Sequence, residues 1–140
     1  MIITPKRMLS SYIEALRPII YINHFDFHVI DKILLDIGYN VNFIEYNNAL
    51  GIINFKTKAP QIECTLSQFL KMVMDEGFDK ETFIILKDIH NYLKDPEIIS
   101  LLKRISENNL YNENYSATIF IISSTVIIPT ELENYITVLD

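Results

Sequence analysis

The sequence predicts an α/β domain, a three-layer α/β/α sandwich around a mostly parallel five-stranded sheet. Apolar, Ile-rich runs at residues 19–22, 83–86 and 118–124 do not alternate with polar residues, which is typical of strands buried on both faces. Segments with apolar residues at helical spacing separate these runs. This alternation of strands and helices indicates a parallel sheet with helices on each side.

Two helices flank the first predicted strand, residues 19–22. Pro5 occupies the first position of the first helix, and Pro18 ends that helix because the residue before a proline avoids the helical region. Asp26 can cap the N-terminus of the second helix. Gly38 closes the second helix and is predicted to be a left-handed C-cap.

The middle of the chain adds a second strand and a third helix. Residues 41–46 alternate as a strand, and residues 52–55 are expected to form a hairpin arm at the sheet edge. Residues 56–63 are mostly polar and are expected to be a connector. Thr65 and Gln68 have the spacing of a capping box, which predicts that the third helix starts there.

The last part of the chain completes the predicted sheet. Residues 83–86 form the third strand, and Asp95 caps the helix that follows it. Residues 108–114 are expected to be a polar loop. The fourth strand covers residues 118–124 and the fifth covers residues 136–139.

Composition and charge exclude several classes of protein. The 140 residues are enough for one domain with one core, so residues 1–140 are taken as a single domain. The net charge of −6 and the scattered Lys and Arg residues argue against a nucleic-acid partner, which needs a basic surface. No apolar run approaches the roughly 18 residues of a membrane helix. A lone Cys64 cannot form an internal disulfide, so a cytoplasmic location is expected.

Polar residues follow the first, third and fourth predicted strands, at the edge where open α/β sheets bind ligands. The candidate crevice residues are His24, Asp26, Asp88, His90, Ser123 and Ser124. Asp88, His90 and Asp95 could hold a magnesium ion or order a water, and the serine hydroxyls could contact a ligand or satisfy their own turn. We favour structural roles, because Ile89 stands where a second carboxylate would be and Asp88 can cap a turn over residues 89–93. No catalytic residue is assigned.

The loop after the first predicted strand has the sequence NHFDFHVIDK. A phosphate-binding loop at this place needs glycines, so that backbone N–H groups can approach the phosphate, and a lysine. The segment has no glycine, and Lys32 lies too far into the helix. His24 and His28 have the spacing of zinc ligands on a helix, but no third ligand is indicated. We therefore expect no nucleotide, metal or other cofactor in this domain.

Three stretches resemble a known family. They are PIIYINHFDFHVIDKILLDIG, FIILKDIHNYLKDPEIISLLKRI and TIFIISSTVIIPTELENYITVLD. They resemble segments of bacterial and plastid AAA-family ATPases in the region that precedes the AAA module. The ending of the third stretch is the most specific part, and residues 51–63 are covered least. The resemblance implies a degenerate relative of the P-loop ATPase core, with strand order 5-1-4-3-2, Asp88 at the Walker B position and Ser124 near the sensor-1 position.

The same resemblance implies a function. The chain would be a non-catalytic, N-terminal regulatory or interaction domain of a longer ATP-hydrolysing protein, with ATP and magnesium bound only in the AAA module. Its expected partners are that module or another protein, and a homo-oligomer is a further option. The alternative is a small-ligand-binding or receiver-like domain that accepts a phosphoryl group at Asp88, with Asp26 as a metal ligand and Ser124 or Thr125 as the switch hydroxyl. A helix before the first strand and the lack of a lysine after the fifth argue against it.

Overall fold

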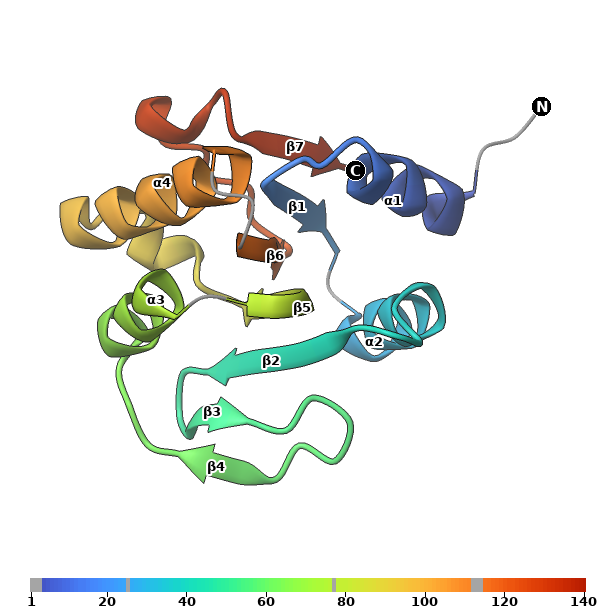
Figure 1. The fold of residues 1–140 in the computed structure, drawn as a ribbon, viewed down its shortest axis with the longest axis horizontal. Helices are drawn as coiled ribbons and strands as arrows, with labels where there is room; N and C mark the ends of the chain where they lie inside the picture. The colour runs from blue at the N-terminus through green and yellow to red at the C-terminus, as the bar shows by residue number, and fades with distance from the viewer. Residues whose placement is uncertain (1–3, 25, 77, 112–114) are drawn as a thin grey trace.

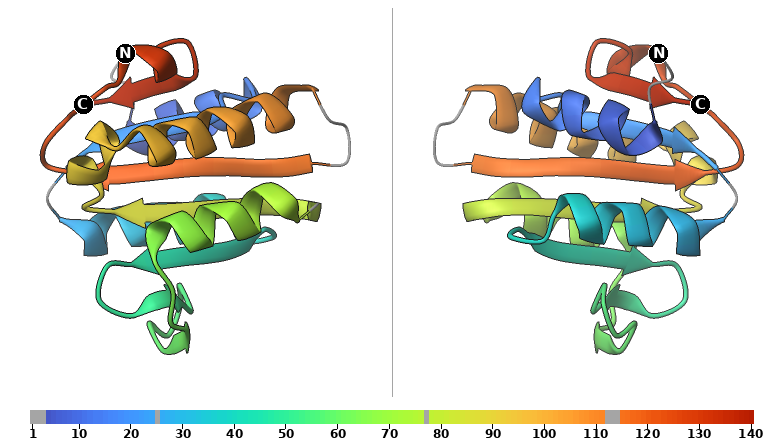
Figure 2. Two further views of the ribbon diagram at one scale, coloured as in Figure 1. Left: turned by 90° about the vertical axis from the view of Figure 1, so that its left-hand side faces the viewer. Right: turned by 90° about the vertical axis from the view of Figure 1, so that its right-hand side faces the viewer.

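Three layers build the computed structural model, which describes residues 4–24, 26–76, 78–111 and 115–140 (Figure 1). A seven-stranded mixed sheet forms the middle layer. Helices α1 (Pro5–Glu14) and α2 (Phe27–Ile37) cover one face of the sheet, and helices α3 (Leu66–Asp75) and α4 (Pro96–Tyr111) cover the other (Figure 2). The predicted α/β class is therefore confirmed.

Parallel pairing dominates the sheet. In chain order, the strands are β1 (Ile19–Asn23), β2 (Asn42–Asn47), β3 (Gly51–Ile53), β4 (Pro60–Ile62), β5 (Phe78–Lys87), β6 (Tyr115–Ser123) and β7 (Ile136–Leu139). Their order across the sheet is β4-β3-β2-β5-β6-β1-β7. Strand β1 pairs in parallel with β6 and β7, and β5 pairs in parallel with β2 and β6. The β2–β3 and β3–β4 pairs are antiparallel.

The prediction of a five-stranded sheet is wrong, because β3 and β4 form an antiparallel hairpin beside β2. Strands β1, β2, β5, β6 and β7 correspond to the five predicted strands, and their order in the sheet, β7-β1-β6-β5-β2, is the predicted 5-1-4-3-2. The hairpin arm predicted at residues 52–55 corresponds to β3, which pairs antiparallel with β2, whereas β4 was not predicted. Residues 56–63, predicted to be a connector, contain β4. This strand has three exposed residues and begins with Pro60, so it lacks the apolar pattern by which longer strands are predicted.

Gly38 is the C-cap of α2, but the prediction of a left-handed conformation is wrong. Its φ is −100°, which any residue can adopt. A Cβ at this position would lie 2.8 Å from ring atoms of both Phe43 and Phe83. Close packing between the end of α2 and the sheet therefore requires glycine here, whereas the backbone geometry does not.

Helix α4 continues to Tyr111, into the segment 108–114 that was predicted to be a loop. The side chain of Asn109 explains the difference, because its Oδ1 accepts a hydrogen bond from the backbone N–H of Ala117 in β6 at 3.0 Å. This contact ties the last turns of the helix to the sheet, which local sequence preference does not reveal. Residues 112–114 lie outside the described residues.

Two apolar cores lie on the two faces of the sheet. Successive residues of one strand enter opposite cores, as Ile84 and Ile85 of β5 show, and both side chains have no exposed surface. Each such isoleucine stabilises the fold by roughly 1.5–3 kcal/mol. The prediction that the central strands are buried on both faces is therefore confirmed. The hairpin joins the second core, since Phe55 stacks on Phe43 with ring centroids 4.6 Å apart.

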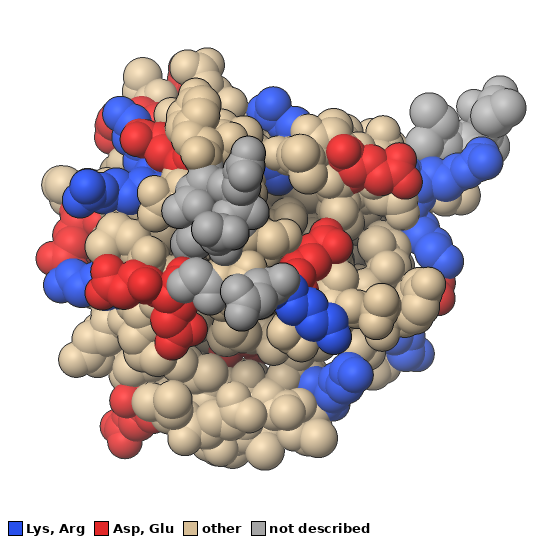
Figure 3. Space-filling view, viewed as in Figure 1, with Lys and Arg blue, Asp and Glu red and all other residues tan. Residues whose placement is uncertain are grey.

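The described surface carries charges of both signs. On the face shown in Figure 3, Lys and Arg side chains are interspersed with Asp and Glu side chains and do not merge into one basic patch. Among the residues with a described position, no helix is long and apolar enough to cross a membrane.

Candidate functional site

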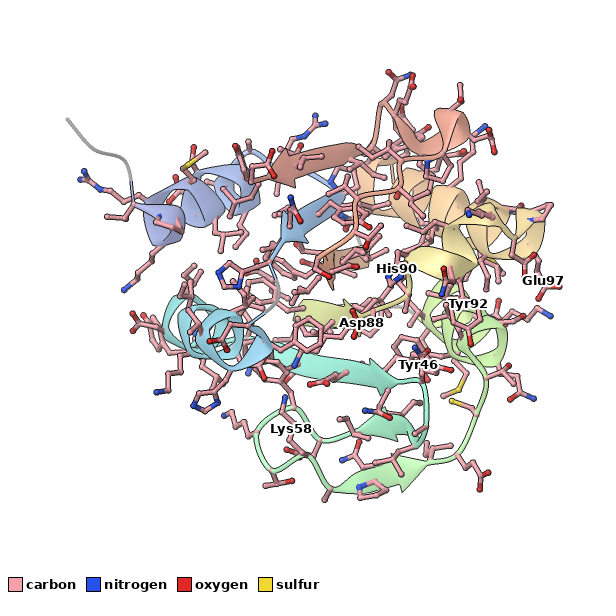
Figure 4. The ribbon with its side chains drawn as sticks, turned by 180° about the vertical axis from the view of Figure 1, so that it is seen from behind. Tyr46, Lys58, Asp88, His90, Tyr92 and Glu97 are labelled. Carbon is pink, nitrogen blue, oxygen red and sulfur yellow. The ribbon has the colours of Figure 1, made fainter. Side chains whose placement is uncertain are left out.

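The sequence-predicted polar residues follow the carboxyl ends of β1, β5 and β6, which are neighbours in the sheet. Figure 4 labels two of these residues, Asp88 and His90. Three contacts hold these strand ends together. The backbone N–H of His24 donates to the carbonyl of Ser123 at 3.1 Å, and the N–H of Asp88 donates to the carbonyl of Ile122 at 3.0 Å. The Ser123 hydroxyl lies 3.0 Å from Nδ1 of His90. The structure thus brings His24, Asp88, His90 and Ser123 together at the carboxyl ends of the parallel strands.

The buried hydroxyl of Ser123 serves its own turn. Its Oγ accepts a hydrogen bond from the backbone N–H of Thr125 at 3.2 Å, in addition to its contact with His90. The Tyr21 hydroxyl donates to the carbonyl of Thr125 at 2.6 Å. Burial raises the pKa of Tyr21, which keeps this donor protonated. Ser124 is exposed and stands outside this network. The structural interpretation of Ser123 therefore agrees with its contacts, whereas Ser124 has no corresponding role.

The N-terminus of α2 is capped by Asp26. The Asp26 carboxylate accepts a hydrogen bond from the backbone N–H of Val29 at 3.3 Å, which confirms the predicted cap. The backbone N–H of Asp26 donates to Nδ1 of His24 at 2.9 Å. His28 is exposed on the helix. Within the described ranges, no group of three or more His, Cys, Asp or Glu side chains is placed to hold a metal ion.

Asp88 adopts an unusual backbone conformation at the end of β5, with φ of +54°. Its N–H is bonded to Ile122, and its carbonyl accepts a hydrogen bond from Nδ2 of Asn48 at 3.3 Å. The prediction that Asp88 caps the next turn is wrong. The 3-10 helix η1 (His90–Lys94) has Ile89 at its N-cap and no side-chain cap, because Asp88 turns away in the left-handed region. Its exposed side chain lines a hollow instead.

This hollow, of about 330 Å³, opens beside the ends of β2 and β5. It is lined by Phe27, residues 45–49, Lys87 and Asp88. Two of the lining residues, Glu45 and Lys87, are charged and largely buried. Neither residue was identified from the sequence. Glu45 could have been, because an acid at a buried position of β2 is unusual.

Glu45 and Lys87 belong to a charge cluster that also contains Asp31 of α2 and Lys58 of the hairpin loop. The Lys87 ammonium lies 2.8 Å from Oδ1 of Asp31 and 3.4 Å from Oε2 of Glu45. The Lys58 ammonium lies 2.9 Å from Oδ2 of Asp31 and 2.5 Å from Oε1 of Glu45. Two cations therefore balance two carboxylates that are 9% and 3% exposed as residues, as burial of charge requires.

The charge cluster holds the hairpin loop on the sheet. Lys58 has a left-handed backbone, with φ of +64°, and its ammonium lies 4.2 Å from the centre of the Phe55 ring. Burial lowers the pKa of Lys58, but hydrogen bonds and charges from Glu45 and Asp31 outweigh burial and raise the pKa above its ordinary value. Although Lys87 is close to both oxygens of Asp31, only Oδ2 accepts a well-directed hydrogen bond, and Oδ1 is held by charge alone.

The fold and these strand ends define an α/β domain with a mostly parallel sheet, in which the polar residues after the strands are engaged largely in hydrogen bonds with one another. A family model described as the SpoVK-like AAA ATPase, N-terminal domain, matches residues 5–140, and the chain belongs to this family. No curated protein matches the chain. The resemblance of the sequence to the N-terminal domain of an AAA-family ATPase is therefore confirmed.

Proposed function

We propose that this domain is a non-catalytic regulatory or interaction module of its AAA ATPase, with a degenerate P-loop NTPase-like fold. The observation that carries the proposal is the acidic cap at the N-terminus of α2. In phosphate-binding α/β domains, free N–H groups and the positive end of the helix dipole face the phosphate. Here the Asp26 carboxylate occupies one of those N–H groups and puts a negative charge at the helix end.

The strand ends support the same proposal. Open α/β sheets bind ligands where the strand order reverses, which in this sheet is between β1 and β6. The backbone bond from His24 to Ser123 joins these two strand ends. The hollow beside Asp88 does not lie at this reversal of the strand order, because it opens at the ends of β2 and β5.

The surroundings of Asp88 also favour a role other than hydrolysis. The resemblance places Asp88 at the Walker B position, where a second acid commonly follows. Ile89 stands there and is completely buried, so it packs in the core. A magnesium ion held by one carboxylate takes its other ligands from water and substrate phosphates, and no group of three or more His, Cys, Asp or Glu side chains is placed to hold a metal among the described residues.

In this proposed role the domain binds proteins. These are the AAA module of its own chain, another protein or a second copy of the domain, in a cytoplasmic setting. Nucleotide and magnesium belong to the AAA module in this proposal. The acidic composition is consistent with a protein partner, since the net charge is −6.

The test is thermal unfolding of the chain with and without millimolar ATP and magnesium. We expect an unchanged melting temperature, because binding to the folded state alone would raise it by mass action. Magnesium sulfate at matched ionic strength controls for general salt effects. A rise of several degrees that is specific to ATP would refute the non-catalytic proposal.

A further inference from the structure

Three hollows adjoin one another around the turn between β2 and β3. The first is the hollow beside Asp88. The second, of about 430 Å³, shares Asn48 and Ala49 with the first and is also lined by Glu63. The third, of about 370 Å³, shares Ala49 and Glu63 with the second and extends along β4. We call these hollows together the turn groove.

We propose that the turn groove binds an extended, basic segment of a partner protein, whose Lys or Arg side chains pair with Asp88 and Glu63. The proposal rests on the interaction role proposed above and assigns that role a surface. It names the class of partner by its charge and its extended conformation.

The charges that line the turn groove select a cation. Glu45 and Lys87 neutralise each other within the charge cluster. Asp88 and Glu63 are exposed, and neither forms an ion pair with a residue of the described ranges. The unpaired charges of the groove are therefore both negative. A phosphate-bearing ligand would be repelled, whereas a basic segment is complementary.

Asp88 is prepared for such a contact. Its left-handed backbone is fixed on both sides, by the hydrogen bond of its N–H to Ile122 and by the hydrogen bond of its carbonyl with Asn48. Non-glycine residues in this conformation cluster at functional sites. A carboxylate on a fixed backbone loses less conformational entropy when a partner binds.

The far end of the turn groove fits an extended chain. Strand β4 is the last strand on this side of the sheet, and all three of its residues are exposed. Leu50 and Ile62, beside the third hollow, are 42% and 50% exposed. An extended segment can lie along a sheet edge and place alternate side chains in pockets. The segment we infer therefore alternates basic residues with apolar ones.

The test is a titration of the isotope-labelled chain, followed by amide NMR, with a capped peptide that alternates Lys or Arg with Val. We expect the largest shifts at Asn48, Asp88 and Glu63, and a loss of affinity with rising salt. Asp88→Asn and Glu63→Gln should each weaken binding about two- to fivefold, as exposed ion pairs do, and about tenfold together if their effects are independent.

Two controls make the result specific. Glu131→Gln removes an exposed acid of the 3-10 helix η2 (Thr130–Leu132), so it changes the net charge equally without touching the groove. A peptide with Gln in place of every Lys and Arg tests the need for charge. Equal weakening by Glu131→Gln, equal binding of the Gln peptide, preferred binding of single-stranded RNA, or no binding at millimolar peptide would each overturn the proposal. None of these outcomes alters the ATP test, so the two proposals fail separately.

Discussion

Replacing Lys87 by methionine should destabilise the domain more than the same replacement of Lys58. The Lys87 side chain is 11% exposed, and the side chains of its partners Asp31 and Glu45 are 13% and 4% exposed. Removing one partner of a buried pair costs about 3–5 kcal/mol, because the remaining charge stays buried without compensation. Lys58 still contacts both carboxylates, so we expect the low end, a loss of about 3 kcal/mol in the free energy of unfolding.

The matched comparison is Lys58→Met. The Lys58 side chain is 43% exposed, and solvent screens its ion pairs. We therefore expect a loss of about 1 kcal/mol or less. Both variants would be measured by urea unfolding at neutral pH, followed by circular dichroism, with the midpoint and the slope fitted together.

A third variant separates charge from packing. Asp31→Asn combined with Lys87→Met removes one charge of each sign and should recover much of the stability lost in Lys87→Met, because neutral replacement of a buried pair is often tolerated. The double-mutant cycle then measures the coupling between the two residues. The reasoning fails if Lys87→Met costs no more than Lys58→Met, or if the double variant is less stable than the sum of its single changes predicts.

Three further predictions concern other sites. Gly38→Ala should lower the free energy of unfolding by about 1–3 kcal/mol in urea, because the added Cβ overpacks against Phe43 and Phe83; an unchanged midpoint would contradict this packing argument. The pKa of Lys58 is raised above 10.5, so its contribution is complete below that pH and is lost as pH rises through the folded pKa. The wild type should therefore lose more thermal stability than Lys58→Arg between about pH 9 and about pH 11.5, and equal losses would show that Lys58 adds nothing. Acetyl phosphate with magnesium should leave Asp88 unmodified by intact-mass measurement, and one added phosphoryl group there would favour the receiver-like alternative.

The parallel part of the fold was predictable because its signal is local. Ile-rich runs such as residues 19–22 pack on both faces, and that double burial leaves a continuous apolar run in the sequence. The caps at Asp26 and Thr65 were also predictable, since each cap bonds a residue three positions away. Strand β4 was missed because, among the described strands, it pairs with β3 alone, and its exposed residues leave no apolar pattern in the sequence.

The charge cluster was not predictable, because its members come from four separate segments of the chain. Each of Asp31, Lys58 and Lys87 resembles an ordinary surface charge when its own segment is considered alone, and the signal at Glu45 does not reveal which residues pair with it. Only the pairing of β2 with β5 and the folding of the hairpin loop over α2 bring them within 4 Å. The conformation of Asp88 depends in the same way on Ile122 and Asn48, which are distant in sequence.

The adjacent residues Lys87 and Asp88 show how the cluster and the turn groove are connected. A lysine next to an exposed acid would ordinarily offset its charge, but Lys87 is engaged by Asp31 and Glu45. The negative charge of Asp88 is therefore left for a group outside the domain. Ile89 leaves Asp88 without an acid at the next position of the sequence. A single cationic side chain, which needs one carboxylate, is the partner that this arrangement fits. Breaking the cluster with Asp31→Asn should release Lys87 toward Asp88 and weaken binding of the basic peptide, although Asp31 does not line the groove; unchanged affinity would show that Lys87 and Asp88 act independently.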